Sequence, residues 1–140
     1  MHCVSVYDYR TICHQTVWDR KYWDNLELSE HGKEILKRCP AATGGYQLFR
    51  QQSLAEGIAK KSEFDLVVSA VAFDGRNQTL ITSIWTSGVK DFQRGWGGLF
   101  KGRAVFKTWT HQEWVEYVRQ NGDENVVEEW VSYINKRYGY

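Results

Sequence analysis

The stretch from Gly44 to Asp74 determines how the rest of this 140-residue chain is expected to fold. Residues 44–61 read GGYQLFRQQSLAEGIAKK, and residues 64–74 read FDLVVSAVAFD. At 100° per residue, the apolar side chains of the first part share one side of a helix; they are Leu48, Leu54, Ala55, Ile58 and Ala59. Within the second part, Leu66–Phe73 is almost continuously apolar and rich in valine, which is typical of a strand covered on both faces. The sequence therefore predicts a helix followed by a buried strand.

Two glutamines, Gln47 and Gln51, fall on the same side of this helix as its apolar residues. A buried amide group costs free energy unless it is hydrogen-bonded. One explanation is that the two side chains bond nearby backbone or lie at the margin of the apolar stripe. The other is that they line a polar site at the edge of the sheet, and the residues alone leave both open.

Composition and charge limit the classes of protein to which the chain can belong. With 140 residues, 42% of them apolar and 25% charged, it suits one folded domain over residues 1–140. A net charge of +1 gives no global field towards nucleic acid or membrane, so any basic surface must be local. The three cysteines form no CxxC pair, which favours a reducing compartment. Without an apparent signal peptide or an apolar run of membrane-spanning length, we expect a cytoplasmic protein with no membrane partner.

The chain before the central helix predicts one strand and little regular structure. Cys3–Tyr9 reads as a short strand, and Thr11–Leu26 as a weak helix or an ordered loop. Ser29 can cap a short helix that runs to about Lys37. We expect Cys3–Tyr9 to pair with the buried strand and Thr43–Lys61 to be the helical crossover, which gives a right-handed βαβ unit.

The chain after the buried strand predicts alternating elements that would complete a small mixed sheet flanked by helices. The expected elements are a turn at 74–77, a helix over Gln78–Phe92, a loop over Arg94–Arg103, a strand over Ala104–Trp109, a helix capped by Thr110 and Glu113, and a last helix capped by Asp123. Val127, Trp130, Val131, Ile134 and Tyr138 share one face of that last helix, which is expected to pack on the sheet. The predicted fold class is thus α/β.

A basic and aromatic segment around the predicted loop is a candidate nucleic-acid interface. Its cations could contact phosphates and its ring could stack on a base; the residues are Lys90, Arg94, Trp96, Lys101, Arg103 and Lys107. The alternative is a flexible surface loop whose charges are solvated. Stacking requires an exposed ring, so the position of Trp96 decides part of this question.

Asp8-Tyr9-Arg10 is a candidate catalytic motif at the end of the first predicted strand. An acid and a base two residues apart on a strand point to the same side. In a metal-dependent phosphodiesterase, Asp8 would hold Mg²⁺ and the base would steady the attacking water or the phosphate. Arg10 is a poor substitute for lysine in this role, because it barely deprotonates. Taken alone, without the resemblance described below, the two residues favour a surface ion pair.

The central stretch resembles the C-terminal half of the PD-(D/E)XK, or restriction-endonuclease-like, nuclease domains. The similarity rests on Tyr46-Gln-Leu-Phe-Arg-Gln51, on the strand Phe64–Phe73, and on the last helix with Trp130-Val-Ser-Tyr-Ile-Asn-Lys-Arg-Tyr138. The resemblance implies that Asp8-Tyr9-Arg10 occupies the place of the family's Asp/Glu-x-Lys motif. It also implies that Gln47 matches the helix glutamine and that Arg50 matches a neighbouring polar position.

The chain departs from the family pattern in its first half. Arg10 replaces the lysine, and the metal-binding aspartate of the preceding strand has no counterpart before Cys3. The resemblance therefore implies a fragment of a larger nuclease-like protein, or a reduced relative without its own complete site. If such a domain is active, it catalyses Mg²⁺-dependent phosphodiester hydrolysis, with Asp8 on the metal, Gln47 on water or phosphate, and Arg50 on the backbone of DNA or RNA.

The composition also supports a second class, a non-catalytic protein-interaction module. Seven tryptophans in 140 residues with a nearly neutral net charge suit a protein interface, because interfaces favour Trp, Tyr and Arg. Such a module would be an inhibitor encoded by a phage or mobile element, or a subunit of an assembly. The sequence leaves its oligomeric state and its partner open.

Overall fold

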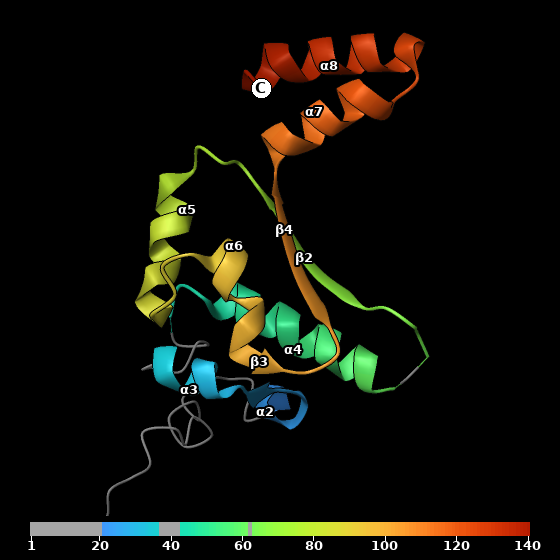
Figure 1. Cartoon of the computed structure of the whole chain (residues 1–140). Coiled ribbons are helices and arrows are strands. Elements are labelled where there is room, and N and C mark those ends of the chain that lie inside the picture. Colours follow the sequence, from blue (N-terminus) through green and yellow to red (C-terminus); the bar gives the residue numbers. More distant parts are fainter. Residues whose placement is uncertain (1–20, 37–42, 62) are drawn as a thin grey trace, which may run out of the picture. The chain divides into compact units, whose positions relative to one another are not determined.

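The computed structural model of the chain describes residues 21–36, 43–61 and 63–140 (Figure 1). The predicted strand Cys3–Tyr9, with Asp8 and Arg10, lies outside these residues. Contacts group the chain into two compact units. Unit 1 holds the described residues of Met1–Ala70 together with Thr79–Lys107, and unit 2 holds Val71–Gln78 and Thr108–Tyr140.

Unit 1 is built mainly from short elements around one long helix. Its regular elements include α2 (Lys21–Asn25), β1 (Glu27–Leu28), α3 (Glu30–Ile35), α4 (Tyr46–Lys60), the 3₁₀ turn η3 (Ile84–Ser87), α6 (Phe92–Gly95), the 3₁₀ turn η4 (Gly97–Leu99) and β3 (Phe100–Lys101). Ser29 caps α3 as predicted, because its hydroxyl accepts a hydrogen bond from the Gly32 N–H at 2.9 Å. The predicted central helix is confirmed as α4.

Aromatic rings on α2, α4 and β3 form the core of unit 1. Phe49 of α4 is fully buried, and its ring centroid lies 4.9 Å from that of Trp23 and 6.1 Å from that of Phe100. The Tyr22 ring meets Phe49 edge-on, and Trp96 packs 5.6 Å from Phe100. Rings of this size dominate the burial of apolar surface in small cores. They fix which face of α4 points inward.

The orientation of α4 differs from the one that the apolar pattern predicts. Leu48, Ala55 and Ala59 are buried as expected, but Leu54 is 65% exposed. The inward face instead includes Phe49, which the predicted stripe omits. The helix is rotated so that the large ring is buried, because an aromatic side chain removes more apolar surface from water than a leucine.

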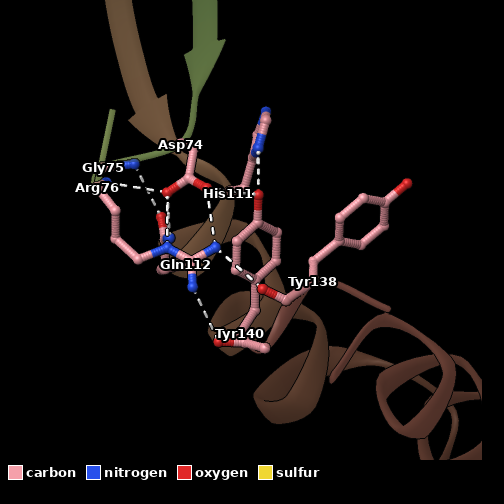
Figure 2. Close-up of polar contacts among 8 residues, drawn as sticks. Asp74, Gly75, Arg76, His111, Gln112, Tyr138 and Tyr140 are labelled. Atoms are coloured by element: carbon pink, nitrogen blue, oxygen red, sulfur yellow. Dashed lines mark hydrogen bonds and ion pairs between the residues drawn. The ribbon is translucent and has the colours of Figure 1, made fainter. Parts of the chain in front are cut away.

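A two-stranded sheet joins β2 (Val68–Phe73) and β4 (Val105–Thr110). The two strands run in the same direction (Figure 2), and the Val105 N–H donates to the Val67 carbonyl at 2.9 Å where the pairing begins. The predicted strands are confirmed, but the expectation that β2 is covered on both faces is wrong. Val68 is 44% exposed, and burial alternates along the strand.

The segment between β2 and β4 is more broken than predicted. The expected helix over Gln78–Phe92 forms only α5 (Gln78–Ser83) and η3, and it ends at Gly88 with φ of +95°. A left-handed residue of this kind ends a helix, and glycine adopts it without a steric cost. The expected loop over Arg94–Arg103 contains α6, η4 and β3, and β3 pairs antiparallel with β1.

Unit 2 consists of the ends of β2 and β4, the turn after β2, and the helices α7 (His111–Asn121) and α8 (Glu124–Tyr138). The predicted capping box is present, since Thr110 accepts from the Glu113 N–H and Glu113 accepts from the Thr110 N–H. Asp123 caps α8 as predicted. Val131 is buried as expected, whereas Tyr138 is 47% exposed, against expectation.

These elements agree with the general α/β class. Among the described residues, no helix is both long enough and apolar enough to cross a membrane.

Candidate functional site

The exposed face of α4 carries two of the residues that the sequence analysis selected. Gln47 and Arg50 are both exposed and lie three residues apart, so their side chains are neighbours on the helix surface. The prediction that Gln47 faces the core is wrong, because burial of Phe49 turns Gln47 towards solvent. Gln51 is half-buried, and its amide donates to the Ala70 carbonyl at 2.5 Å. Its inward position is thus explained by a backbone hydrogen bond.

Two tyrosines lie beside this face. Tyr22 of α2 and Tyr46 of α4 share a side-chain hydrogen bond. Burial of Tyr22, followed by the hydrogen bond to Tyr46, raises the pKa of the Tyr22 hydroxyl from 10.0 to about 12, although the nearby Arg50 acts in the opposite direction. Tyr22 therefore stays neutral at physiological pH, and the pair supplies hydroxyl groups next to a cation.

The buried polar residues of α4 are Gln52, Ser53 and Glu56, which sequence reasoning did not single out. Glu56 is 2% exposed. Its carboxylate accepts from the backbone N–H of Arg103 at 3.0 Å, from that of Ala104 at 3.2 Å, and from Gln52 Nε2 at 3.2 Å. A buried carboxylate with several donors is a stable arrangement. Glu56 thus fastens the start of β4 to α4.

Gly102 is required by this arrangement, because a Cβ at this position would overlap the Glu56 carboxylate. Two further buried polar atoms, Gln52 Oε1 and Ser69 Oγ, have no hydrogen-bond partner among the residues that the structure describes. The spacing of Gln52 and Glu56, four residues apart on α4, was the sequence signal for this cluster. The apolar pattern does not reveal this cluster, because the backbone donors to Glu56 come from Arg103 and Ala104, far along the chain.

The basic segment holds five exposed cations, Lys90, Arg94, Lys101, Arg103 and Lys107, and one acid, Asp91. Arg94 lies 3.9 Å from Asp91, and Lys101 lies 2.8 Å from Glu27. Both are exposed ion pairs, which contribute little to stability and are screened by salt. Lys90 and Lys107 form no ion pair within the part of the chain that the structure describes.

Trp96 does not present its ring as a stacking surface. The side chain is 0% exposed and packs on Phe100, and a Cβ on Gly45 would lie 3.1 Å from the ring. The prediction that Trp96 stacks on a base is therefore wrong in this structure. The glycine-rich neighbourhood that suggested a flexible loop instead lets the backbone pack closely around a buried ring.

A second polar cluster lies in unit 2, around the turn after β2 (Figure 2). Asp74 Oδ2 accepts from Arg76 Nη2 at 2.9 Å, and Asp74 Oδ1 accepts from Gln112 Nε2 at 2.7 Å. Hydrogen bonds from the Arg76 side chain and backbone hold the pKa of Asp74 well below its ordinary value of 3.8. The cluster keeps Asp74 ionised over the physiological range.

The last residue of the chain completes this cluster. The Tyr140 hydroxyl donates to Asp74 Oδ2 at 3.2 Å and lies 2.9 Å from His111 Nδ1. Arg76 also donates to the carbonyls of Tyr138 and Gly139, and its guanidinium lies over the Tyr140 ring. These hydrogen bonds hold the end of α8 and the residues after it against the turn that follows β2.

Asp8, from which a metal site is expected, lies outside the described part of the chain. No group of three or more His, Cys, Asp and Glu side chains among the described residues is arranged to hold a metal ion. Asp8 and Arg10 lie outside those residues, so their expected approach to Gln47 stays a prediction. No catalytic step through Mg²⁺ follows from the described side chains.

The chain matches no known protein family, no curated protein and no solved structure. The site must therefore be interpreted from its own residues.

Proposed function

We propose that the chain binds nucleic acid through unit 1, as a degenerate or partial PD-(D/E)XK nuclease-like domain. The basic segment of residues 90–107 carries this proposal, because it holds five exposed cations and one acid, whereas the net charge of the whole chain is only +1. Lysine and arginine that neutralise phosphates release counterions, which is the main source of affinity in sequence-independent binding. The ligand class that suits this segment is the phosphate backbone of DNA or RNA.

The exposed face of α4 supports the same proposal from a second position. Arg50 would contact a phosphate, and Gln47 would donate or accept a hydrogen bond beside it, as the resemblance implies. Neither role needs the helix to move, because both side chains already reach solvent. Trp96 takes no part, so the binding proposed here relies on phosphate contacts and not on base stacking.

The proposal includes catalysis only if the chain can assemble a complete metal site. Phosphodiester hydrolysis would need Asp8, Mg²⁺ and a further acid from outside the described residues or from another chain. The test is incubation with Mg²⁺ or Mn²⁺ and with duplex DNA, single-stranded DNA and RNA. Cutting that survives Asp8→Ala would remove Asp8 from the mechanism, and failure to cut any form would leave a binding domain.

Binding itself is tested by fluorescence anisotropy of labelled DNA and RNA between 20 and about 200 mM salt, the range over which phosphate contacts lose strength. We expect affinity to fall steeply with salt. The double variant Lys90→Gln/Lys107→Gln should reduce the slope against salt by about 2 for duplex DNA, because two phosphate contacts are lost. Lys136→Gln/Arg137→Gln in unit 2 is the control, and it should leave the slope unchanged.

A binding curve that does not depend on salt, or that responds equally to both double variants, would contradict the proposal. Gln47→Ala separates the α4 contribution, since an exposed residue can be replaced without loss of the fold. A normal unfolding transition with weaker binding would place Gln47 at the interface. Unchanged binding would restrict the interface to the basic segment.

The second candidate function, a protein-interaction module, is favoured by unit 2. Its exposed aromatic residues are Trp109, Trp114, Tyr117, Tyr133 and Tyr138. It contains four Lys and Arg residues against seven Asp and Glu residues, a net charge of −3 that disfavours nucleic acid. Exposed rings without a positive field suit a protein partner. Capture of one stoichiometric partner that is retained in Lys90→Gln/Lys107→Gln would support this function.

A further inference from the structure

A hollow on the surface of unit 2 is formed by four residues from the end of β4 and from α7. Trp109, Glu113, Trp114 and Tyr117 line a space of about 360 Å³. This volume lies at the lower end of the range for small-ligand sites, about 300–1,000 Å³. All four residues belong to unit 2 and are exposed, so the hollow is open to solvent. Its size suits a single side chain or a ligand of similar size.

The walls of the hollow are three aromatic rings. Trp114 and Tyr117 lie one helical turn apart on α7, with ring centroids 5.6 Å apart and planes inclined by 18°. Their exposed fractions are 49% and 57%, and Trp109 is 37% exposed. Aromatic faces carry a negative quadrupole, which attracts an organic cation.

The fourth wall is the carboxylate of Glu113, and only one of its two oxygens is used in the capping box. Glu113 Oε2 accepts from the Thr110 N–H and hydroxyl in the capping box, at 2.6 and 3.0 Å. Glu113 Oε1 has no hydrogen-bond partner among the residues that the structure describes. The Thr110 hydrogen bonds also lower the pKa of the Glu113 carboxyl, so the hollow keeps a negative charge at neutral pH.

The charge of the surrounding unit acts in the same direction. Of the four lysine and arginine residues in unit 2, Arg76 is held by Asp74, Arg119 lies 3.3 Å from Glu116, Arg137 contacts Tyr133 and Tyr138, and Lys136 is exposed on α8. None of them lines the hollow. A net charge of −3 in the unit attracts a cation and repels phosphate. The hollow is thus complementary to a positive side chain supplied from outside the unit.

We propose that this hollow binds the guanidinium group of an arginine side chain presented by a protein partner. A guanidinium is planar, so it can stack on Trp114 or Tyr117 while its N–H groups reach the free Glu113 oxygen. It is also more weakly hydrated than an ammonium group, which lowers the cost of removing it from water. The inference deepens the second candidate function, because it names the chemistry of the partner, and it is independent of nucleic-acid binding by unit 1.

The probe is an acetylated and amidated Gly-Arg-Gly peptide, titrated into ¹⁵N-labelled full chain at low salt. The indole N–H signals of Trp109 and Trp114, assigned from single variants, should shift with the peptide. The Trp85 signal is the internal reference, since that indole donates to the Lys90 carbonyl in unit 1 and lies outside the hollow. The same peptide with citrulline in place of arginine has nearly the same shape without the charge, and it should bind at least tenfold more weakly.

Three variants test the walls of the hollow. Trp114→Ala should weaken binding by about three- to thirtyfold, the range expected for one cation–π contact. Glu113→Gln should weaken it by about two- to fivefold, while the capping box remains, because glutamine also serves in that motif. Tyr133→Ala removes an exposed ring of α8 outside the hollow and should leave the affinity unchanged. Circular dichroism checks that α7 is retained in each variant.

Several results would overturn the inference. Equal binding of the arginine and citrulline peptides would exclude a cation site, and tighter binding of a trimethyllysine peptide would exclude a guanidinium as the intended group. Loss of binding in Tyr133→Ala but not in Trp114→Ala would place the contact elsewhere on unit 2. A contact elsewhere on unit 2 would still agree with a protein-interaction module. Failure to capture any protein partner would contradict the protein-interaction module, and the peptide titration would be unaffected by that result.

Discussion

The carboxylate of Glu56 lies 3.0 Å from the backbone nitrogen of Arg103, although 47 residues separate them in the chain. The next backbone N–H, that of Ala104, donates to the same carboxylate at 3.2 Å. Two consecutive N–H groups donate to one buried carboxylate, so this side chain fixes where the start of β4 lies along α4. The contact explains why α4 can bury the acid Glu56 beside Gln52 and Ser53.

Replacing Glu56 should loosen the start of β4. Glu56→Ala leaves the two N–H groups without their acceptor, and we expect a loss of about 1–3 kcal/mol in the free energy of unfolding. Glu56→Gln keeps one acceptor oxygen and should fall between Glu56→Ala and the wild type. Urea unfolding measures the loss, and amide exchange should accelerate selectively at Arg103 and Ala104. Unchanged exchange there would show that the carboxylate does not hold these groups in solution.

The rotation of α4 is tested by a matched pair of leucines on that helix. Leu48 is 7% exposed and Leu54 is 65% exposed. Leu48→Ala should cost about 2–5 kcal/mol, because it leaves a cavity beside Phe49. Leu54→Ala should change stability by less than about 0.5 kcal/mol. Urea denaturation followed by tryptophan fluorescence compares the two, and a larger loss at Leu54 would restore the orientation that the apolar pattern predicts.

The elements that the sequence predicts well are those set by local chemistry. The capping box at Thr110 and Glu113 involves residues three apart, and its geometry needs no other part of the chain. Asp123 at the start of α8 and Ser29 at the start of α3 are similar cases. Each side chain satisfies a backbone N–H of its own helix, so the signal and the structure lie in the same few residues.

The features that the sequence does not predict depend on distant partners. Glu56 is inward because of N–H groups 47 and 48 residues away, and Trp96 is buried because α4 and β3 close around it. The apolar pattern placed Leu54 on the inner side of the helix and gave no reason to place Glu56 or Gln52 there. The orientation of α4 also changes the candidate site, because Gln47 and Arg50 are both exposed on the helix surface. Asp8 and Arg10 lie outside the described residues.

Tyr22 should titrate unusually late. Its pKa is raised to about 12 by burial and by the hydrogen bond with Tyr46, against 10.0 for an ordinary tyrosine. Because the folded state favours the neutral hydroxyl, the stability it confers is fully present below pH 10 and is lost as the pH rises through about 12. Ultraviolet titration of the tyrosinate band should lose its latest step in Tyr22→Phe and not in Tyr117→Phe, whose ring is exposed. An unaltered late step would contradict the assignment.

Acid should weaken unit 2 through Asp74. Its pKa is lowered by the hydrogen bonds from Arg76, then by the one from Gln112, so the folded state binds a proton less readily than the unfolded chain, in which the ordinary value is 3.8. The stability from this group is therefore complete well above pH 3.8 and is lost as the pH falls through the lowered pKa. Asp74→Asn should remove that dependence and lower the melting temperature at pH 7. The control is Glu128→Gln, which changes an exposed residue of α8. Thermal unfolding of the wild type and both variants is followed by circular dichroism between pH 2 and about 7, the range in which carboxylates titrate. If Asp74→Asn kept the acid-dependent loss of the wild type, another carboxylate would have to be its source.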